Sequence, residues 1–228
     1  MKNNKKILAN ALIEICNHKP LDNVTVTEIT KKAGLTRQVF YHHFVDKYEL
    51  AKWIHMMDYV GEIEEKSSHY DELIYWKDVS FEWLSVLEKH KVFYQNLYHS
   101  IADKEFQRLI RMHIFDSYKY TIEYSLKEKL NEEMIFSLQI YCTGLTERIH
   151  DWIRDGMNIP VSQFCDWMFA AMPSTIRKVM SEYKVSKKML IKQTKFVLGT
   201  VPPTPHRPAR RPTRPPMLPA VTALSPSI

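Results

Sequence analysis

The sequence has few of the residues that punctuate β-proteins and few of those that build disulfide frameworks. Only five glycines occur among 228 residues, and few Asn-Gly or Asp-Gly pairs mark tight hairpins. The three cysteines, Cys16, Cys142 and Cys165, are an odd number without a Cys-x-x-Cys pair. Such thiols are typically buried and reduced rather than joined in a disulfide framework. These scarcities favour an all-α fold in a reducing compartment.

Long hydrophobic runs and catalytic motifs are also missing. No apolar run is long enough to span a bilayer, and Asn10 and Glu14 interrupt the apolar stretch after the basic start, which argues against a signal peptide. The sequence contains no phosphate-binding glycine-rich loop, Gly-x-Ser-x-Gly or His-Glu-x-x-His pattern. We therefore expect a cytoplasmic protein that has no membrane partner and is not an enzyme.

The charges that are present are divided unevenly along the chain. Residues 1–52 hold nine Lys/Arg and five Asp/Glu, whereas residues 53–190 hold 17 and 21. A basic front end on a mildly acidic body suits a protein that approaches phosphates with one end only. Residues 191–228 hold six basic and no acidic residues and nine of the twelve prolines. This tail cannot bury a core, so we expect it to be disordered or polyproline-like.

Apolar residues at helical spacing predict a series of helices. The first runs from about Ile7 to Cys16, and two short helices follow within 25–44. Asp46 and Glu49 form a capping box for the next helix, which reaches about Val60. Further helices are predicted over 71–89, 91–100, 103–130, 132–155 and 161–183, the last of them kinked at Pro173. We expect a three-helix domain over 1–46, a helical bundle that dimerises over 47–190 and the tail over 191–228.

The stretch from Thr25 to Phe44 has the order of a helix-turn-helix. A capped helix with inward-facing residues comes first, then a glycine suited to positive φ, an apolar plug and the cap of a second helix. The residues with these roles are Thr25, Glu28, Ile29, Ala33, Gly34, Leu35, Thr36, Phe40 and Phe44. The alternative is a plain helical hairpin whose polar residues are solvated.

The second helix of this stretch exposes residues that suit base edges in a major groove. Arg37 can pair with guanine, Gln38 with adenine, and a Val39 methyl group can contact thymine, while His42 lies one turn further on. The groups placed to bind phosphates, with help from two helix N-termini, are Thr25, Thr36, Tyr41 and Lys47.

Residues 25–50 closely resemble the signature of the TetR family of transcriptional regulators. After the threonine-capped helix and the Ala-Gly turn, the run Tyr41-x-x-Phe44-x-x-Lys47-x-x-Leu50 matches the family pattern. Thr30 departs from it, because the family usually has alanine there. The resemblance implies base contacts from Arg37, Gln38 and Val39, and backbone contacts from Thr25, Thr36, Tyr41, His42, His43 and Lys47.

The rest of the chain resembles regulators of dihydroxyacetone kinase operons more weakly. The matching features are Trp53-Ile54, the segment Leu87–Tyr94, Gly144 and the segment Trp152–Gly156. The family resemblance implies a homodimer on a palindromic operator, with the dimer surface formed by the two C-terminal helices. Gly144 would let helix backbones approach closely; the other candidate contacts, which could instead fill the core of one subunit, are Tyr141, Leu145, Arg148, Trp152, Met168, Met172 and Ile176.

The middle helices carry aromatic and histidine residues with an apolar body and a polar tip, as ligand pockets do. Glu147, His150 and Asp151 share a helix, but no second cluster has ligand spacing, so we predict neither a metal site nor a cofactor. The pocket candidates for an unidentified small-molecule effector are Trp83, Phe93, Tyr94, Tyr98, His113, Tyr118, Tyr141 and His150. Any one of them is more often an ordinary core residue.

Together these features predict a sequence-specific regulator that binds double-stranded DNA, a repressor rather than an activator. An effector in the C-terminal domain would control operator affinity, and the helix from Lys47 to about Val60 would act as the lever between the two parts. The alternative is a helical protein-interaction module or co-activator with little direct DNA binding.

Overall fold

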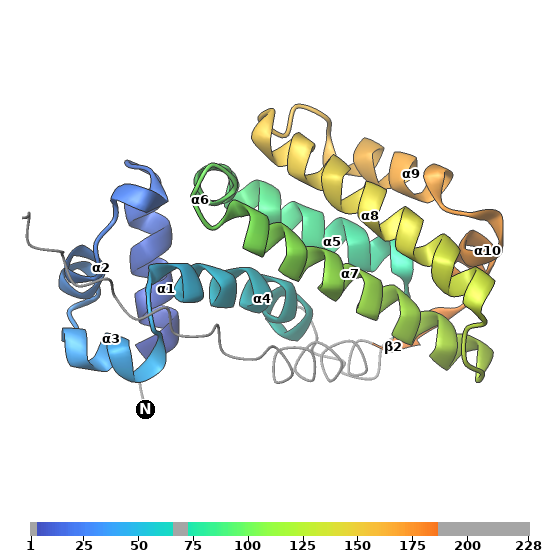
Figure 1. Ribbon diagram of the computed structural model, residues 1–228, viewed down its shortest axis with the longest axis horizontal. Coiled ribbons are helices and arrows are strands. Elements are labelled where there is room, and N and C mark those ends of the chain that lie inside the picture. The colour runs from blue at the N-terminus through green and yellow to red at the C-terminus, as the bar shows by residue number, and fades with distance from the viewer. Residues whose placement is uncertain (1–3, 66–72, 187–228) are drawn as a thin grey trace, which may run out of the picture.

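The computed structural model describes residues 4–65 and 73–186, and this part of the chain is built almost entirely of helices (Figure 1). The all-α fold class predicted from the sequence is confirmed. One 3₁₀-helix, Leu21–Asn23, and two three-residue strands, Leu73–Tyr75 (β1) and Lys184–Ser186 (β2), accompany the helices. The helices are α1 (Asn4–Cys16), α2 (Val26–Ala33), α3 (Arg37–His43), α4 (Lys47–Glu65), α5 (Trp76–Lys89), α6 (Lys91–Tyr98), α7 (Asp103–Leu126), α8 (Glu132–Arg154), α9 (Val161–Ala171) and α10 (Ser174–Glu182).

Helices α1, α2 and α3 form a small N-terminal unit at one end of the molecule (Figure 1). Its core contains Leu8 and Leu12 from α1, Ile29 from α2 and Phe40 from α3, all with no exposed surface. Thr30 is buried beside them, and its hydroxyl donates to the carbonyl of Val26 at 3.0 Å. The hydroxyl is therefore satisfied within its own helix, which explains how threonine fits where the sequence pattern favours alanine.

Helix α4 leads from the N-terminal unit to the larger bundle of α5 to α10 (Figure 1). Helices α7 and α8 lie side by side along the bundle, and α5 packs against α4 and α9. The core is continuous from Trp76 on α5 through Phe106 on α7 to Ile149 on α8 and Ile176 on α10.

The bundle is held to the N-terminal unit by polar contacts around α6. The side-chain amide of Asn96 donates to the carbonyl of Cys16 at 2.7 Å, and the carboxylate of Asp22 accepts from the hydroxyl of Tyr48 at 2.8 Å and from the backbone N–H of Ile101 at 3.2 Å. These contacts join α1, α4 and the turn after α6. A movement of α4 would therefore be transmitted to the N-terminal unit.

Several helix boundaries differ from the prediction. Helix α4 reaches Glu65 rather than about Val60, and α6 ends at Tyr98 rather than at residue 100. Helix α5 begins at Trp76 because residues 73–75 pair as β1 with β2, antiparallel, with Ile74 opposite Val185. Helix α7 ends at Leu126 because Lys127 is left-handed, with φ of 57°. The predicted single helix over 161–183 is two helices, because the residue before Pro173 is extended and proline cannot donate the next helical hydrogen bond.

The three cysteines are buried and free, as predicted, and burial raises the pKa of the Cys16 thiol to about 12. Across 4–65 and 73–186, no helix is long and apolar enough to cross a membrane. The predicted tail over 191–228 lies outside the described residues.

Candidate nucleic-acid interface

The start of α2 has the capping box predicted from its sequence. The hydroxyl of Thr25 accepts from the backbone N–H of Glu28 at 3.2 Å, and the backbone N–H of Thr25 donates to the Glu28 carboxylate at 2.8 Å. Lys19 adds an ion pair to Glu28 at 2.6 Å, and these partners lower the pKa of Glu28 to about 2. The first turn of α2 is thus fixed by side chains that lie on the surface.

Gly34 makes the turn that joins α2 to α3. Its φ of 64° and ψ of 31° are left-handed, a conformation that glycine adopts without steric cost. The backbone N–H of Leu35 donates to the carbonyl of Thr30 at 2.9 Å and closes the end of α2. Thr36 then caps α3 by accepting from the backbone N–H of Val39 at 3.3 Å. The predicted helix-turn-helix is therefore present in its predicted order.

Helix α3 presents its first turn to solvent. Arg37 and Gln38 are exposed and Val39 is half-buried, while Phe40 behind them has no exposed surface. The Arg37 guanidinium lies over the ring of Tyr41 at 5.9 Å, and Tyr41 itself is 51% exposed. The residues predicted to contact base edges are accordingly accessible, which is the geometry that a recognition helix needs.

The residues predicted to contact phosphates fall into two groups. Thr25, Thr36, Tyr41 and His42 are exposed on the same small unit as α3. His43 is half-buried, and desolvation, with further contributions from His42 and Lys5, lowers the pKa of its imidazole.

Lys47 has a structural role that the sequence did not predict. Its ammonium donates to the carbonyls of Asp22 at 2.5 Å and Val24 at 2.8 Å and lies 5.1 Å from the ring centroid of Tyr48. Desolvation is the main cause that lowers its pKa. Two of its three N–H groups thus tie the chain before α2 to the start of α4, so a phosphate contact by Lys47 depends on the third.

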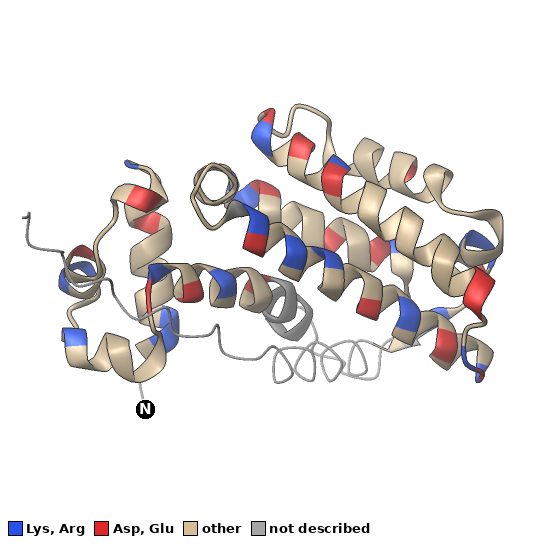
Figure 2. Cartoon of the chain, in the orientation of Figure 1, with Lys and Arg blue, Asp and Glu red and all other residues tan. Residues whose placement is uncertain are grey.

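Basic side chains gather around this unit without a large uniform patch (Figure 2). Lys5 lies 5.6 Å from the ring centroid of Phe44, and Lys32 pairs with Glu14. Along α7 of the bundle, acidic and basic residues are interspersed (Figure 2). Phosphate attraction in the described region must therefore come from a few side chains and from the N-termini of α2 and α3.

A second surface, along α8 and α9, is apolar and open. Phe136, Ile140 and Gly144 follow one another at one-turn spacing on α8, and Trp167 lies on α9. Phe136 is 64% exposed, Ile140 60% and Trp167 53%, and Ile140, Gly144 and Trp167 line a hollow of about 710 Å³. We call Phe136, Ile140, Gly144 and Trp167 the α8–α9 face.

Most of the predicted dimer contacts lie behind this face rather than on it. Gly144 and Arg148 are exposed, whereas Ile176 has no exposed surface and Met172 has 3%. Met172 at the end of α9 and Ile176 on α10 both belong to the hydrophobic core of the single subunit, the alternative left open by the sequence. The remaining candidates, Tyr141, Leu145, Trp152 and Met168, are also at most 8% exposed, although they line the hollow.

The bundle has a cavity of about 30 Å³ lined mainly by α4, α5 and α7, with Leu145 from α8 and Met168 from α9. Of the predicted pocket residues, Trp83, His113 and Tyr118 line it. The others are not among its lining residues: Phe93 and Tyr94 lie in the core, the Tyr141 hydroxyl donates to the carbonyl of Met168, and Tyr98 packs against His150. Four further lining residues carry polar atoms and are not among the predicted pocket residues: His55, Trp76, Ser80 and Ser117. Their helical periodicity is that of ordinary core, so only the fold reveals them.

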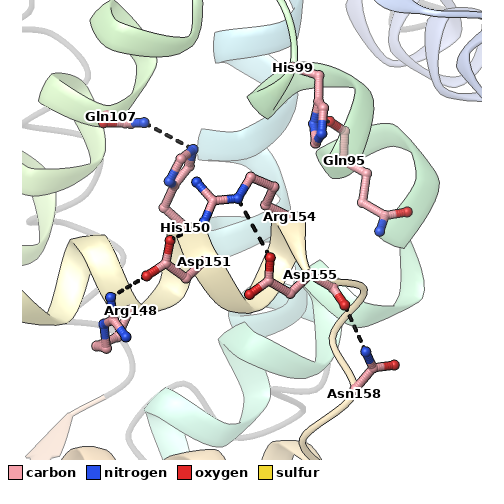
Figure 3. A network of polar contacts seen from close by, with 9 residues as sticks. All are labelled: Gln95, His99, Gln107, Arg148, His150, Asp151, Arg154, Asp155 and Asn158. Atoms are coloured by element: carbon pink, nitrogen blue, oxygen red, sulfur yellow. Dashed lines mark hydrogen bonds and ion pairs between the residues drawn. The ribbon is translucent and has the colours of Figure 1, made fainter.

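The carboxylates considered for a metal site are already paired with arginine. Figure 3 shows Asp151 directed at Arg148, and Asp151 also binds Arg154 at 2.6 Å. Glu147 pairs with Arg111 at 3.3 Å, and His150 with Gln107 at 3.0 Å. Throughout the described ranges, no group of three or more His, Cys, Asp or Glu is arranged to hold a metal ion.

Comparison with known proteins decides the family. Residues 8–53 match the sequence profile of bacterial regulatory proteins of the tetR family, and residues 75–174 match that of a TetR transcriptional regulator C-terminal region. The two profiles together account for more than half of the chain. The chain belongs to the TetR family. It is a DNA-binding transcriptional regulator of the helix-turn-helix class, and because this family consists of regulators, the prediction that it is not an enzyme is confirmed.

One curated relative is the HTH-type dhaKLM operon transcriptional activator DhaS of Lactococcus lactis. It is 28% identical over 103 residues, which are 45% of this chain and 52% of DhaS, so the match spans about half the length of that relative. A solved structure titled dihydroxyacetone kinase operon activator DhaS has a TM-score of 0.59 at 18% identity and covers 81% of this chain and all of its own. The predicted resemblance to this subgroup is thus confirmed, and the structural match shows a shared fold.

Proposed function

We propose that this TetR-family regulator binds a palindromic operator as a homodimer and that an effector in the C-terminal domain changes its operator affinity. Residues 1–46 would contact DNA, and residues 47–190 would dimerise and sense the effector. The observation that carries the proposal is the exposed first turn of α3, where Arg37 and Gln38 project from a unit fixed by Gly34 and Phe40.

Dimerisation is supported by the α8–α9 face. A single seven-residue α3 helix contacts too few bases for useful specificity, so two copies are needed. The face exposes three large apolar side chains, Phe136, Ile140 and Trp167, and exposed apolar patches on soluble proteins often mark interfaces. Gly144 in its centre leaves open space where a Cβ would be, which allows a partner helix to approach closely. We propose this face as the contact between two-fold related subunits.

Coupling between the bundle and DNA is supported by the contacts of α4. Near its start, Lys47 and Tyr48 hold the segment before α2. Further along, His55 lines the cavity, and Asp58 accepts hydrogen bonds from Tyr94 at 2.7 Å and from the ring of His90 at 2.9 Å. One rigid helix thus touches the cavity and the N-terminal unit, so a shift of α4 would change the spacing of the two α3 helices.

The direction of regulation has two candidates. The sequence favoured a repressor, whereas the curated relative is named an activator of its operon. A reporter fused to the promoter of the adjacent genes, measured with and without this protein, separates them: expression falls with a repressor and rises with an activator.

Equilibrium binding to the intergenic DNA next to the gene tests the proposal. Replacing Arg37 with Ala should weaken binding roughly 5- to 150-fold, the loss expected for a bidentate base contact. Arg108→Ala is the matched control because it removes the same charge from an exposed site on α7. Equal affinities of the two variants, or no binding by the natural protein at low salt, would reject direct readout by α3 and favour a protein-interaction module.

A further inference from the structure

His55 is a buried polar residue that the fold does not satisfy. It lies on α4 with 2% of its surface exposed, and its ring makes edge-to-face contacts with Trp83, Tyr94 and Phe106 at centroid distances of 5.0 to 6.1 Å. Its Nδ1 atom has no hydrogen-bond partner. A buried polar atom without a partner destabilises a protein by about 1–3 kcal/mol, so a phenylalanine would serve the core better. This cost suggests a role in binding.

The cavity beside His55 has walls of a distinct chemistry. Rings form much of it, and Trp76 and Tyr118 meet edge to face at 4.8 Å. Ser80 and Ser117 add small hydroxyl groups, and the rest of the lining is aliphatic or Met168. Among the described residues that line it, none is Asp, Glu, Lys or Arg. Burial lowers the pKa of His55 to about 3 and that of His113 to about 4, so both imidazoles are uncharged at neutral pH.

These walls limit what the cavity accepts. A charged ligand would lose its hydration without meeting an opposite charge, which is costly in a low-dielectric interior. Ring-lined walls favour a flat apolar body through edge-to-face and stacked contacts. The unpaired nitrogen of His55 favours one hydrogen-bonding group on that body.

We propose that the cavity binds a small, uncharged aromatic compound with a hydroxyl group, and that this hydroxyl bonds to His55 Nδ1 so that α4 senses the ligand. This inference rests on the proposed function, because operator affinity is what the ligand would change. It adds the chemical class of the effector and the residue that detects it.

The size of the cavity explains why binding would move α4. At about 30 Å³ it has room for about two water molecules, too little for an aromatic ring. A ligand can therefore enter only a state in which the walls have moved apart. Of the helices that line the cavity, α4 is the one that continues into the N-terminal unit, and His55 lies about 12 Å along it from Lys47 at 1.5 Å per residue. A ligand that binds only the opened state increases the fraction of molecules in which α4 has moved.

Four small probes test the ligand class on the full chain. Phenol has a ring and a hydroxyl, toluene only the ring, benzoate a ring with a charge, and glycerol hydroxyls without a ring. Tryptophan fluorescence reports binding, because Trp76 and Trp83 line the cavity, and a thermal shift gives a second readout. Phenol should bind best and toluene more weakly, and benzoate and glycerol should not bind. Better binding of benzoate or glycerol, or no binding of phenol, would overturn the proposal.

Variants test the role of His55. In His55→Phe, phenol affinity should fall about tenfold, the value of one hydrogen bond, while toluene affinity stays within twofold and shows that the cavity is intact. His150→Phe is the matched control, since it removes a buried imidazole outside the cavity and should leave phenol affinity unchanged. His55→Gln, which keeps a hydrogen-bonding amide, should restore part of the loss. Equal phenol affinity in the natural protein and His55→Phe would overturn the assignment.

Operator affinity is also measured without any probe. This measurement distinguishes a failure of the proposed function from a failure of the proposed ligand class. If DNA does not bind while phenol follows the pattern above, the proposed function fails and the ligand class of the cavity stands. If DNA binds and saturating phenol leaves its affinity unchanged, sensing by α4 is refuted although the regulator assignment survives.

Discussion

A single methyl group added at Gly34 tests the geometry of the turn between α2 and α3. Gly34 has φ of 64°, and a Cβ built there meets no atom within 4 Å. Gly34→Ala would therefore cause no clash, and its cost is the backbone energy of holding alanine in the left-handed region. That energy is about 1–2 kcal/mol, so the free energy of unfolding should fall by this amount.

Urea denaturation of the full chain, followed by circular dichroism, measures the loss. Gly34→Asn is the matched variant, because asparagine tolerates the left-handed region better and should be less destabilising. With a total stability of about 5–15 kcal/mol, Gly34→Ala should remain folded and bind DNA at 25 °C. A neutral or stabilising Gly34→Ala would refute the left-handed turn and with it the presentation of α3.

Three further predictions follow from the fold. Ile140→Asp should convert a dimer to monomers in analytical ultracentrifugation. The control Phe81→Asp changes an exposed apolar residue of α5 and should leave the dimer intact. A dimer that persists in Ile140→Asp would contradict the α8–α9 interface. Lys47→Met should lower the free energy of unfolding by about 1 kcal/mol, because the carbonyls of Asp22 and Val24 lose a donor, and an unchanged urea midpoint would refute this role. The free energy of unfolding should fall as the pH drops from about 6.5 toward 4, because the unfolded chain binds protons at His55 and His113 in this range and the folded chain does not. Each histidine lowers the free energy of unfolding by at most about 1.4 kcal/mol per pH unit. If the free energy of unfolding of His55→Phe has the same slope against pH as that of the natural protein, the role of His55 is contradicted.

The helix-turn-helix could be predicted residue by residue because its signals are local. Thr25, Gly34 and Thr36 act through hydrogen bonds and backbone angles within three or four residues, so their types reveal their roles. For the same reason, the sequence predicts a kink at Pro173. In the structure the residue before Pro173 is extended, so the helix is divided in two.

The bundle was predicted less completely because its sites depend on contacts between distant segments. Apolar spacing marks Ile176 and Trp167 alike, yet one is fully buried and the other half-exposed on the α8–α9 face. The cavity brings together His55, Trp76 and His113 from three helices, and no local pattern links them. Likewise, Lys47 matches a phosphate-binding position, and only the fold reveals the carbonyls of Asp22 and Val24 beside it.

Methylation-protection footprinting with dimethyl sulfate on the protein–operator complex tests the central claim most directly, since it reports contacts at guanine N7 in the major groove. Two α3 helices of a symmetric dimer should give two protected sets of guanines on one face of the duplex, about 10 bp or a multiple of it apart. Arg37→Ala should abolish protection within both sets while Arg108→Ala preserves it. Protection of only one set of guanines, or protection that persists in Arg37→Ala, would contradict recognition by a pair of α3 helices.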